Sequence, residues 1–231
     1  MRKNKVIGLV IKLIAIISSI YGIIKTYLGW MSFTYFTVLS NIFMLIMLAV
    51  FFIRDIIVII KNKNIIYNNL LYITKFLATI SITLTFLVFL TLLAPTIPGG
   101  IIYAYLNNGA GSLCVHFITP ILAIIDFLLF DKEYKSNKKH TIYAIIPPLI
   151  YVLYVIILGM LGVRWGNMLA PYNFLNYGAK TGWFGFDLSI IGWESLGIGV
   201  IYMIIFLTLL FILLGRLFLF IQNNLKGDNY E

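Results

Sequence analysis

The sequence predicts an all-α integral membrane protein, built as a bundle of six transmembrane helices. Of its 231 residues, 61% are hydrophobic and only 11% are charged, and a soluble domain could not cover so much apolar surface with so few charges. Several apolar runs reach the ~18 residues that a helix needs to cross a bilayer. Because no internal repeat and no separate soluble segment is visible, we expect one integral membrane domain over residues 1–231.

Composition also limits the partners. The net charge of +9 comes from basic residues scattered between apolar runs, so the positive-inside rule explains it better than binding to nucleic acid does. The single cysteine, Cys114, excludes an intramolecular disulfide and a cysteine metal cluster. We therefore expect no metal, no cofactor and no nucleic acid, and the sequence gives no oligomeric state.

Six apolar runs give the expected helices, over residues 6–27, 35–53, 70–93, 113–130, 142–163 and 188–215. The first run follows the basic start MRKNK and resembles a signal peptide, but Lys12 interrupts it and no small-x-small cleavage site follows. We expect it to be retained as a helix. The second helix is expected to end at Arg54, and residues 56–60 either extend it or lie in the membrane interface.

Proline and glycine mark the breaks between the later helices. The segment 95–100 contains two of each and should end the third helix, leaving residues 101–112 as an ordered loop. The prolines at 147–148 should kink the fifth helix or delay its regular start. The connection 164–187 is long and rich in aromatic residues, which favour the membrane interface. Loops of this length are more often functional than bare connectors.

Charge asymmetry predicts the orientation. Twelve Lys and Arg residues lie in one set of loops and tails, whereas the opposite loops hold only Arg164 and Lys180. By the positive-inside rule, both termini and the loop 131–140 face the cytoplasm, with His140 as an ordinary surface residue of that loop. The aromatic connection and the loop before the fourth helix then lie outside.

Two ionisable residues lie inside the fourth helix, His116 and Asp126, and such residues are functional-site candidates because they are costly in a bilayer. At ~1.5 Å per residue, His116 lies roughly 22 Å above an inner boundary at Asp131. On the second helix, Thr37 lies roughly 25 Å above Arg54. Thr37 and His116 are therefore expected at nearly equal depth, close to the outer surface.

This placement suggests nucleophilic catalysis. Ser40 and Asn41 share the helix face of Thr37, so a polar cluster could form around His116. A threonine hydroxyl is a weak nucleophile until a neighbouring base takes its proton, and histidine has a suitable pKa for that role. The group that would orient the base is open among three residues: Asn41, Asp187 and Glu194. The competing interpretation is that these polar groups only join helices.

Asp126 lies roughly 7 Å above the inner boundary, level with Lys75 and Lys12 on helices that start at the same side. The favoured interpretation is a structural ion pair. A proton relay is the alternative.

Three segments resemble the landmarks of a known family: YFTVLSNIF (35–43), HFITPILAIIDFLLF (116–130) and APYNFL (170–175). They are similar to segments of the androgen-induced/androgen-dependent membrane protein family and its bacterial relatives. Animal members of that family are multi-pass hydrolases that cleave fatty acid esters of hydroxy fatty acids with a threonine nucleophile and a histidine. The resemblance implies those roles for Thr37 and His116. The third segment lacks the second proline of the bacterial pattern.

We therefore expect a lipid-ester hydrolase of a bacterial plasma membrane, with Thr37 and His116 as the catalytic pair. The expected supporting residues are Ser40, Asn41, Asp126 and Glu194, and the expected substrate-binding residues are Tyr172, Trp183 and Phe184. The first alternative is a non-enzymatic lipid-binding or transport protein, in which His116 and Asp126 mark a polar path. The second is a partner subunit whose polar residues only join helices.

Overall fold

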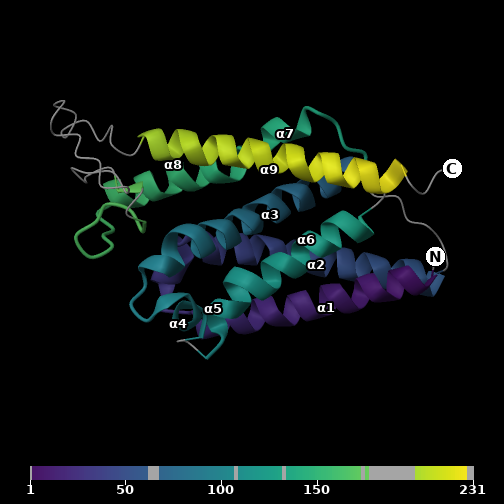
Figure 1. Cartoon of the computed structure of the whole chain (residues 1–231), viewed down its shortest axis with the longest axis horizontal. Helices are drawn as coiled ribbons and strands as arrows, with labels where there is room; N and C mark the ends of the chain where they lie inside the picture. Colours follow the sequence, from purple (N-terminus) through teal and green to yellow (C-terminus); the bar gives the residue numbers. More distant parts are fainter. Residues whose placement is uncertain are drawn as a thin grey trace. The chain divides into compact units, whose positions relative to one another are not determined.

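The computed structural model of the chain is all-helical, as predicted (Figure 1). It describes residues 2–61, 68–106, 109–131, 134–172, 175–176 and 201–227. In this part of the chain, 6 helical segments are long and apolar enough to cross a membrane: Lys5–Lys25, Phe36–Lys61, Asn69–Thr96, Gly111–Phe130, His140–Met160 and Met203–Leu225. The chain divides into two compact units, described separately below. The single-domain organisation and the orientation of the termini stay predictions.

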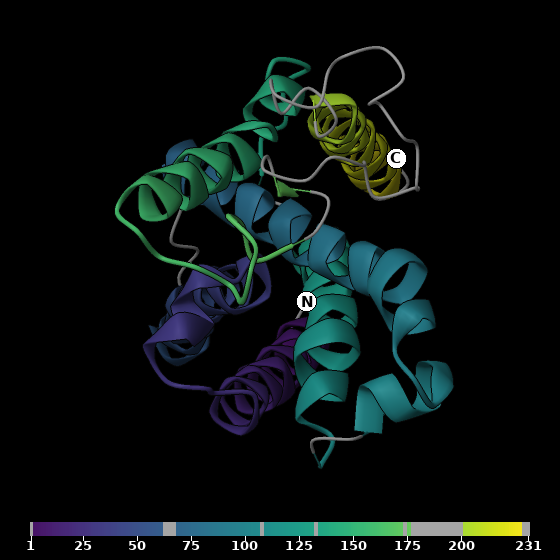
Figure 2. The same cartoon turned by 90° about the vertical axis from the view of Figure 1, so that its left-hand side faces the viewer.

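The larger unit comprises Met1–Thr141 and Gly215–Glu231. Its longest N-terminal helices are α1 (Arg2–Lys25), α2 (Phe36–Lys61), α3 (Asn69–Val88) and α6 (Thr119–Phe130). Within this unit α1 packs on α2, α2 on α3, α3 on α6 and α6 on α1 (Figure 2). These four helices therefore form a closed ring. Large apolar side chains such as Met44, Phe51 and Phe76 are fully buried in it.

Small residues let α1 approach its neighbours closely. A Cβ added at Gly22 would lie 2.6 Å from Val115 Cγ1 and 3.1 Å from the Val115 backbone nitrogen. At Gly8 it would meet the ring of Phe130 at 2.8 Å. Glycine at such positions is how transmembrane helices bring their backbones together. The contact at Gly22 fixes α1 against the segment that carries His116.

Two of the spans contain a π-helical turn, and both turns have the same cause. In one, α3 continues into η2 (Phe89–Leu93) and the 3₁₀ turn η3 (Ala94–Thr96). The other span is assembled from α5 (Gly111–Leu113), η4 (Cys114–Ile118) and α6. Each turn ends two residues before a proline, Pro95 or Pro120, whose ring cannot follow a regular α-helical turn. Such wide turns are frequent at functional sites.

Several boundaries in the larger unit differ from the expectation. The helix α2 continues to Lys61, so Arg54 lies inside a helix and is buried. Within the expected loop, residues Gly100–Leu106 form α4. The residues before α2 form a 3₁₀ turn, η1 (Trp30–Thr34). These differences place more polar side chains inside the unit than the sequence suggested.

The expectation for His140 was wrong. It begins the short helix α7 (His140–Tyr143) and is buried rather than exposed. Its Nδ1 accepts a hydrogen bond from the backbone N–H of Asn137 at 3.1 Å and contacts the hydroxyl of Tyr134 at 2.7 Å. The residue therefore anchors the loop that precedes it.

The smaller unit, Ile142–Leu214, contains α8 (Ile146–Met160) and the first part of α9 (Ile201–Gly227). Pro147 and Pro148 lie in the first turn of α8, where a missing N–H costs no intrahelical bond, so they delay the start of the helix as predicted. The helix α9 runs to Gly227, beyond the expected end at residue 215. Residues 177–200, where that helix was expected to begin, lie outside the described residues.

Candidate functional site

Asn41 connects the turn that carries Thr37 to the turn that carries His116. It is fully buried on α2, and its Nδ2 donates to the carbonyl oxygen of Thr37 at 2.8 Å and to that of Val115 at 3.0 Å. A side-chain amide has two N–H groups, so both are used. Thr37 and His116 therefore lie on adjacent turns of neighbouring helices, in agreement with their expected equal depth.

The local sequence explains why the Val115 carbonyl is available to Asn41. In η4 the N–H of Thr119 donates to the carbonyl of Cys114, five residues back. The next bond of this pattern would need an N–H at Pro120, which has none. A buried carbonyl without a partner is costly, and the Asn41 amide supplies the missing donor. Asn41 thus replaces the hydrogen-bond donor that Pro120 lacks.

The ring of His116 is oriented by stacking. It lies on the ring of Phe89 with 3.7 Å between centroids and 10° between planes. Phe89 begins the other π-helical turn, so the two wide turns face each other at this contact. Nδ1 of His116 is buried and has no hydrogen-bond partner in the described part of the chain. One ring nitrogen is therefore not committed to the protein's own polar groups.

Thr37 and Ser40 lie on α2, on the helix face that also carries Asn41. Thr37 is half-buried, and its carbonyl oxygen also accepts a hydrogen bond from Ser40 Oγ at 3.1 Å. Ser40 Oγ is 2.8 Å from Thr85 Oγ1 on α3. Among the described residues no hydrogen bond joins Thr37 to His116. The structure brings the two residues to neighbouring turns but does not join their side chains.

Further hydroxyl groups that the sequence analysis missed surround Asn41 and His116. On α1, Ser19 Oγ donates to the carbonyl of Asn41 at 3.4 Å, and Ser18 Oγ accepts from Thr119 at 3.0 Å. The sequence contained a signal for Ser18 and Ser19, because they are adjacent polar residues within an apolar run. These bonds attach α1 to the same level of the unit.

Of the other expected site residues, Asp126 does not belong to this cluster. Asp126 lies ten residues beyond His116, about 15 Å along the helix. Tyr172 belongs to the smaller unit, where its ring lies 6.3 Å from that of Tyr151. Four expected or candidate residues lie outside the described part of the chain: Trp183, Phe184, Asp187 and Glu194.

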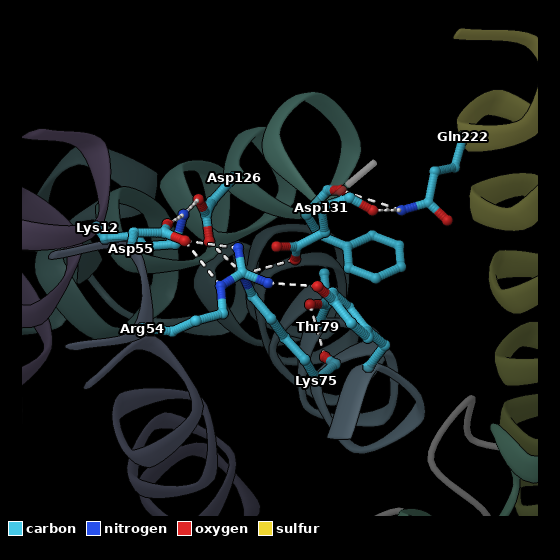
Figure 3. A network of polar contacts seen from close by, with 10 residues as sticks. Lys12, Arg54, Asp55, Lys75, Thr79, Asp126, Asp131 and Gln222 are labelled. Atoms are coloured by element: carbon cyan, nitrogen blue, oxygen red, sulfur yellow. Dashed lines mark hydrogen bonds and ion pairs between the residues drawn. The ribbon is translucent and has the colours of Figure 1, made fainter. Parts of the chain in front are cut away.

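A second polar cluster lies roughly 20 Å along α2 from Asn41, and it consists of six charged side chains in alternating order (Figure 3). The successive contacts are Arg54–Asp55 at 2.6 Å, Asp55–Lys12 at 2.9 Å, Lys12–Asp126 at 2.6 Å, Asp126–Lys75 at 2.5 Å and Lys75–Asp131 at 2.6 Å. We call this set the charge chain. Its three cations balance its three carboxylates. The predicted ion pair of Asp126 is confirmed, with both Lys12 and Lys75 as partners.

The charge chain is buried almost completely. Lys12, Lys75, Asp126 and Asp131 have no exposed side-chain area, and Asp55 keeps only 13%. At one end Arg54 donates to the hydroxyl of Tyr72 at 2.5 Å. At the other end Gln222 of α9 donates to the backbone carbonyl of Asp131 at 3.2 Å. Removing one partner of such a buried ion pair costs much more than removing both. Because its members come from α1, α2, α3 and the end of α6, the charge chain ties these four helices together.

Within the described residues, no group of His, Cys, Asp and Glu side chains is placed to hold a metal ion. Comparison of the chain with protein-family models, curated proteins and solved structures finds no match.

Proposed function

We propose that the chain is a membrane-embedded lipid-ester hydrolase with Thr37 as nucleophile and His116 as general base. The observation that carries the proposal is the pair of hydrogen bonds donated by the Asn41 amide, 2.8 Å to the carbonyl oxygen of Thr37 and 3.0 Å to that of Val115. These bonds hold the turns of Thr37 and His116 side by side. The resemblance of residues 35–43 and 116–130 to the threonine hydrolases supports the same pair.

The surroundings of His116 suit a general base. A base must present a ring nitrogen that no protein group occupies, and Nδ1 of His116 has no hydrogen-bond partner among the described residues. Stacking on Phe89 restricts ring rotation, which is the role that a hydrogen-bonded third group usually has. Hydrogen bonds between catalytic groups often form only in the complex with substrate, so the proposed pair does not require a bond between Thr37 and His116 beforehand.

The substrate class follows from the location of the pair within apolar spans. A lipid ester can reach this level by lateral movement in the bilayer. Thr37 would attack the ester carbonyl while His116 takes the proton, and water would hydrolyse the acyl-enzyme. Tyr172, Trp183 and Phe184 remain the proposed contacts for the acyl chain.

Labelling with a fluorophosphonate probe, which reacts with activated hydroxyl groups, tests the proposal. Wild-type protein in detergent should be labelled, Thr37→Ala should not, and Thr37→Ser should retain part of the labelling because a hydroxyl remains. His116→Ala should slow labelling by roughly 10²–10⁴-fold, the usual contribution of a general base. Ser40→Ala is the matched control, because Ser40 lies on the same helix face and neither attacks nor accepts the proton.

Two outcomes would contradict the hydrolase. One is a folded wild-type protein that is never labelled, and the other is Thr37→Ala labelled as fast as wild type. A lipid-binding or transport function would then replace it, with His116 as a polar contact of the bound lipid.

A further inference from the structure

Tyr105 has a buried hydroxyl without a hydrogen-bond partner. Its side chain, in α4, is only 8% exposed, and its Oη has no partner in the described part of the chain. It belongs to a hydrophobic cluster with Phe89, Ala94 and Ala104, flanked by Leu90, Leu93, Ile97 and Leu113. An unpaired buried hydroxyl is unfavourable for the folded state. A phenylalanine would fill this position without that cost, so the hydroxyl suggests a partner from outside the chain.

The position of Tyr105 connects it to the catalytic pair. Its ring meets Phe89 edge-on, with 5.0 Å between centroids, and Phe89 is the ring on which His116 stacks. Tyr105 also lies 6.1 Å from the ring of Phe117, the residue after His116. Tyr105 and His116 thus contact the same aromatic side chain.

Several other donors of the site are already used. Both N–H groups of Asn41 are donated to backbone carbonyls, Ser40 Oγ contacts the Thr37 carbonyl and Thr85, and Thr119 donates to Ser18. Backbone N–H groups in the interior of a helix are bonded within the helix. Ester hydrolysis needs a donor aimed at the oxygen on which negative charge develops. Tyr105 is the buried hydroxyl of this region that has no partner among the described residues.

We propose that the Tyr105 hydroxyl donates the hydrogen bond that stabilises the oxyanion of the reaction, an assignment that rests on the hydrolase function proposed above. Thr37 Oγ1 forms a bond to the acyl carbon as its proton passes to His116. The carbonyl π electrons move onto the carbonyl oxygen, which accepts the hydrogen bond from Tyr105 without taking its proton. The oxyanion then re-forms the carbonyl, the C–O bond to the leaving alcohol breaks, and that oxygen takes the proton from His116.

The test compares two phenylalanine substitutions in the full-length protein, with p-nitrophenyl butyrate as the ester and thermal unfolding as a second measurement. Tyr105→Phe should lower kcat about 10²–10³-fold, the effect of removing one oxyanion donor, with little change in KM. Its unfolding midpoint should equal or exceed that of wild type, because the unpaired hydroxyl is gone. Tyr103→Phe is the control: Tyr103 belongs to the same helix and is 53% exposed, so its kcat should stay at the wild-type level.

The measurements separate failure of the inference from failure of the hydrolase. If wild type hydrolyses the ester and Tyr105→Phe has the same kcat, the assignment of Tyr105 is overturned while the hydrolase stands. The same holds if Tyr105→Phe loses kcat only together with a lowered unfolding midpoint, because Tyr105 would then be a packing residue. A wild-type protein that is neither labelled by the fluorophosphonate nor active on the ester overturns both.

Discussion

The side-chain amide of Asn41 donates a hydrogen bond to the backbone carbonyl of Val115 across 3.0 Å, between α2 and the π-helical turn η4. Pro120 creates the need for this bond, because it removes the N–H that would continue the bonding pattern of the turn. A change at position 41 should therefore affect both stability and the placement of Thr37 relative to His116.

Asn41→Leu keeps the side-chain size but removes the donor. We expect it to destabilise the protein by about 1–3 kcal/mol, because the Val115 carbonyl is left buried and unsatisfied. Hydrolysis should fall more than stability alone explains, since small displacements of catalytic groups are costly. Thermal unfolding and fluorophosphonate labelling of the same samples check this. Ser40→Ala is the control, and equal losses in both variants would contradict a special role for Asn41.

Asp126 is the central carboxylate of the charge chain, in contact with two ammonium groups. Asp126→Asn should lower the unfolding midpoint in detergent strongly, because the loss of one partner from a buried ionic set typically costs about 3–5 kcal/mol. Adding Lys75→Met or Lys12→Met restores neutrality and should recover part of the loss. Asp131→Asn should cost less, because Asp131 has one ammonium partner. Double variants less stable than Asp126→Asn would show that charge balance is not what stabilises this region.

Asp131 predicts a pH dependence of stability. It follows the membrane-spanning segment, and burial raises the pKa of its carboxyl to about 6, although the Lys75 ammonium opposes this shift. A raised folded-state pKa means that the native state holds the proton more tightly than the unfolded chain. This contribution to stability is present at acid pH and is lost as pH rises through about 6. The unfolding midpoint of wild type relative to Asp131→Asn should therefore fall between about pH 4 and 6, and parallel profiles would contradict it.

The predicted orientation can be tested with single cysteines. In a Cys114→Ala background, cysteine at position 138 should be protected in intact cells from a membrane-impermeant thiol reagent, because Lys138 lies in a loop expected to be cytoplasmic. Cysteine replacing Asn108 should react from outside. Labelling of the position 138 variant in intact cells would reverse the topology and move the Thr37–His116 site to the opposite leaflet.

The sequence predicted the helical membrane fold because apolar runs long enough to cross a bilayer are a direct physical signal. Arg54 and Asp131 were both read as helix ends because charged residues usually mark one. The helix α6 does end at Phe130, but α2 continues past Arg54, and the burial of both charged side chains was missed. Their neutralising partners come from other helices, and a linear sequence does not show which helices pack together. The level of Thr37 and His116 could be predicted, since helical rise is constant. Phe89 and Tyr105 were missed because the stacking of Phe89 on His116 and the contact of Tyr105 with Phe89 arise from helix packing, although Pro95 and Pro120 marked both irregular turns.

The order in which the members of the charge chain occur in the sequence has a consequence for biosynthesis. Helices emerge from the ribosome in sequence, and a charge inside an inserting helix is unfavourable. Arg54 is synthesised together with its partner Asp55. Lys12 and Lys75 add two ammonium groups, but Asp55 is the one carboxylate of the charge chain that α1, α2 and α3 contain. The remaining two carboxylates, Asp126 and Asp131, arrive only with the fourth span. Membrane insertion of the first three helices therefore leaves an excess of positive charge that is neutralised when α6 is synthesised.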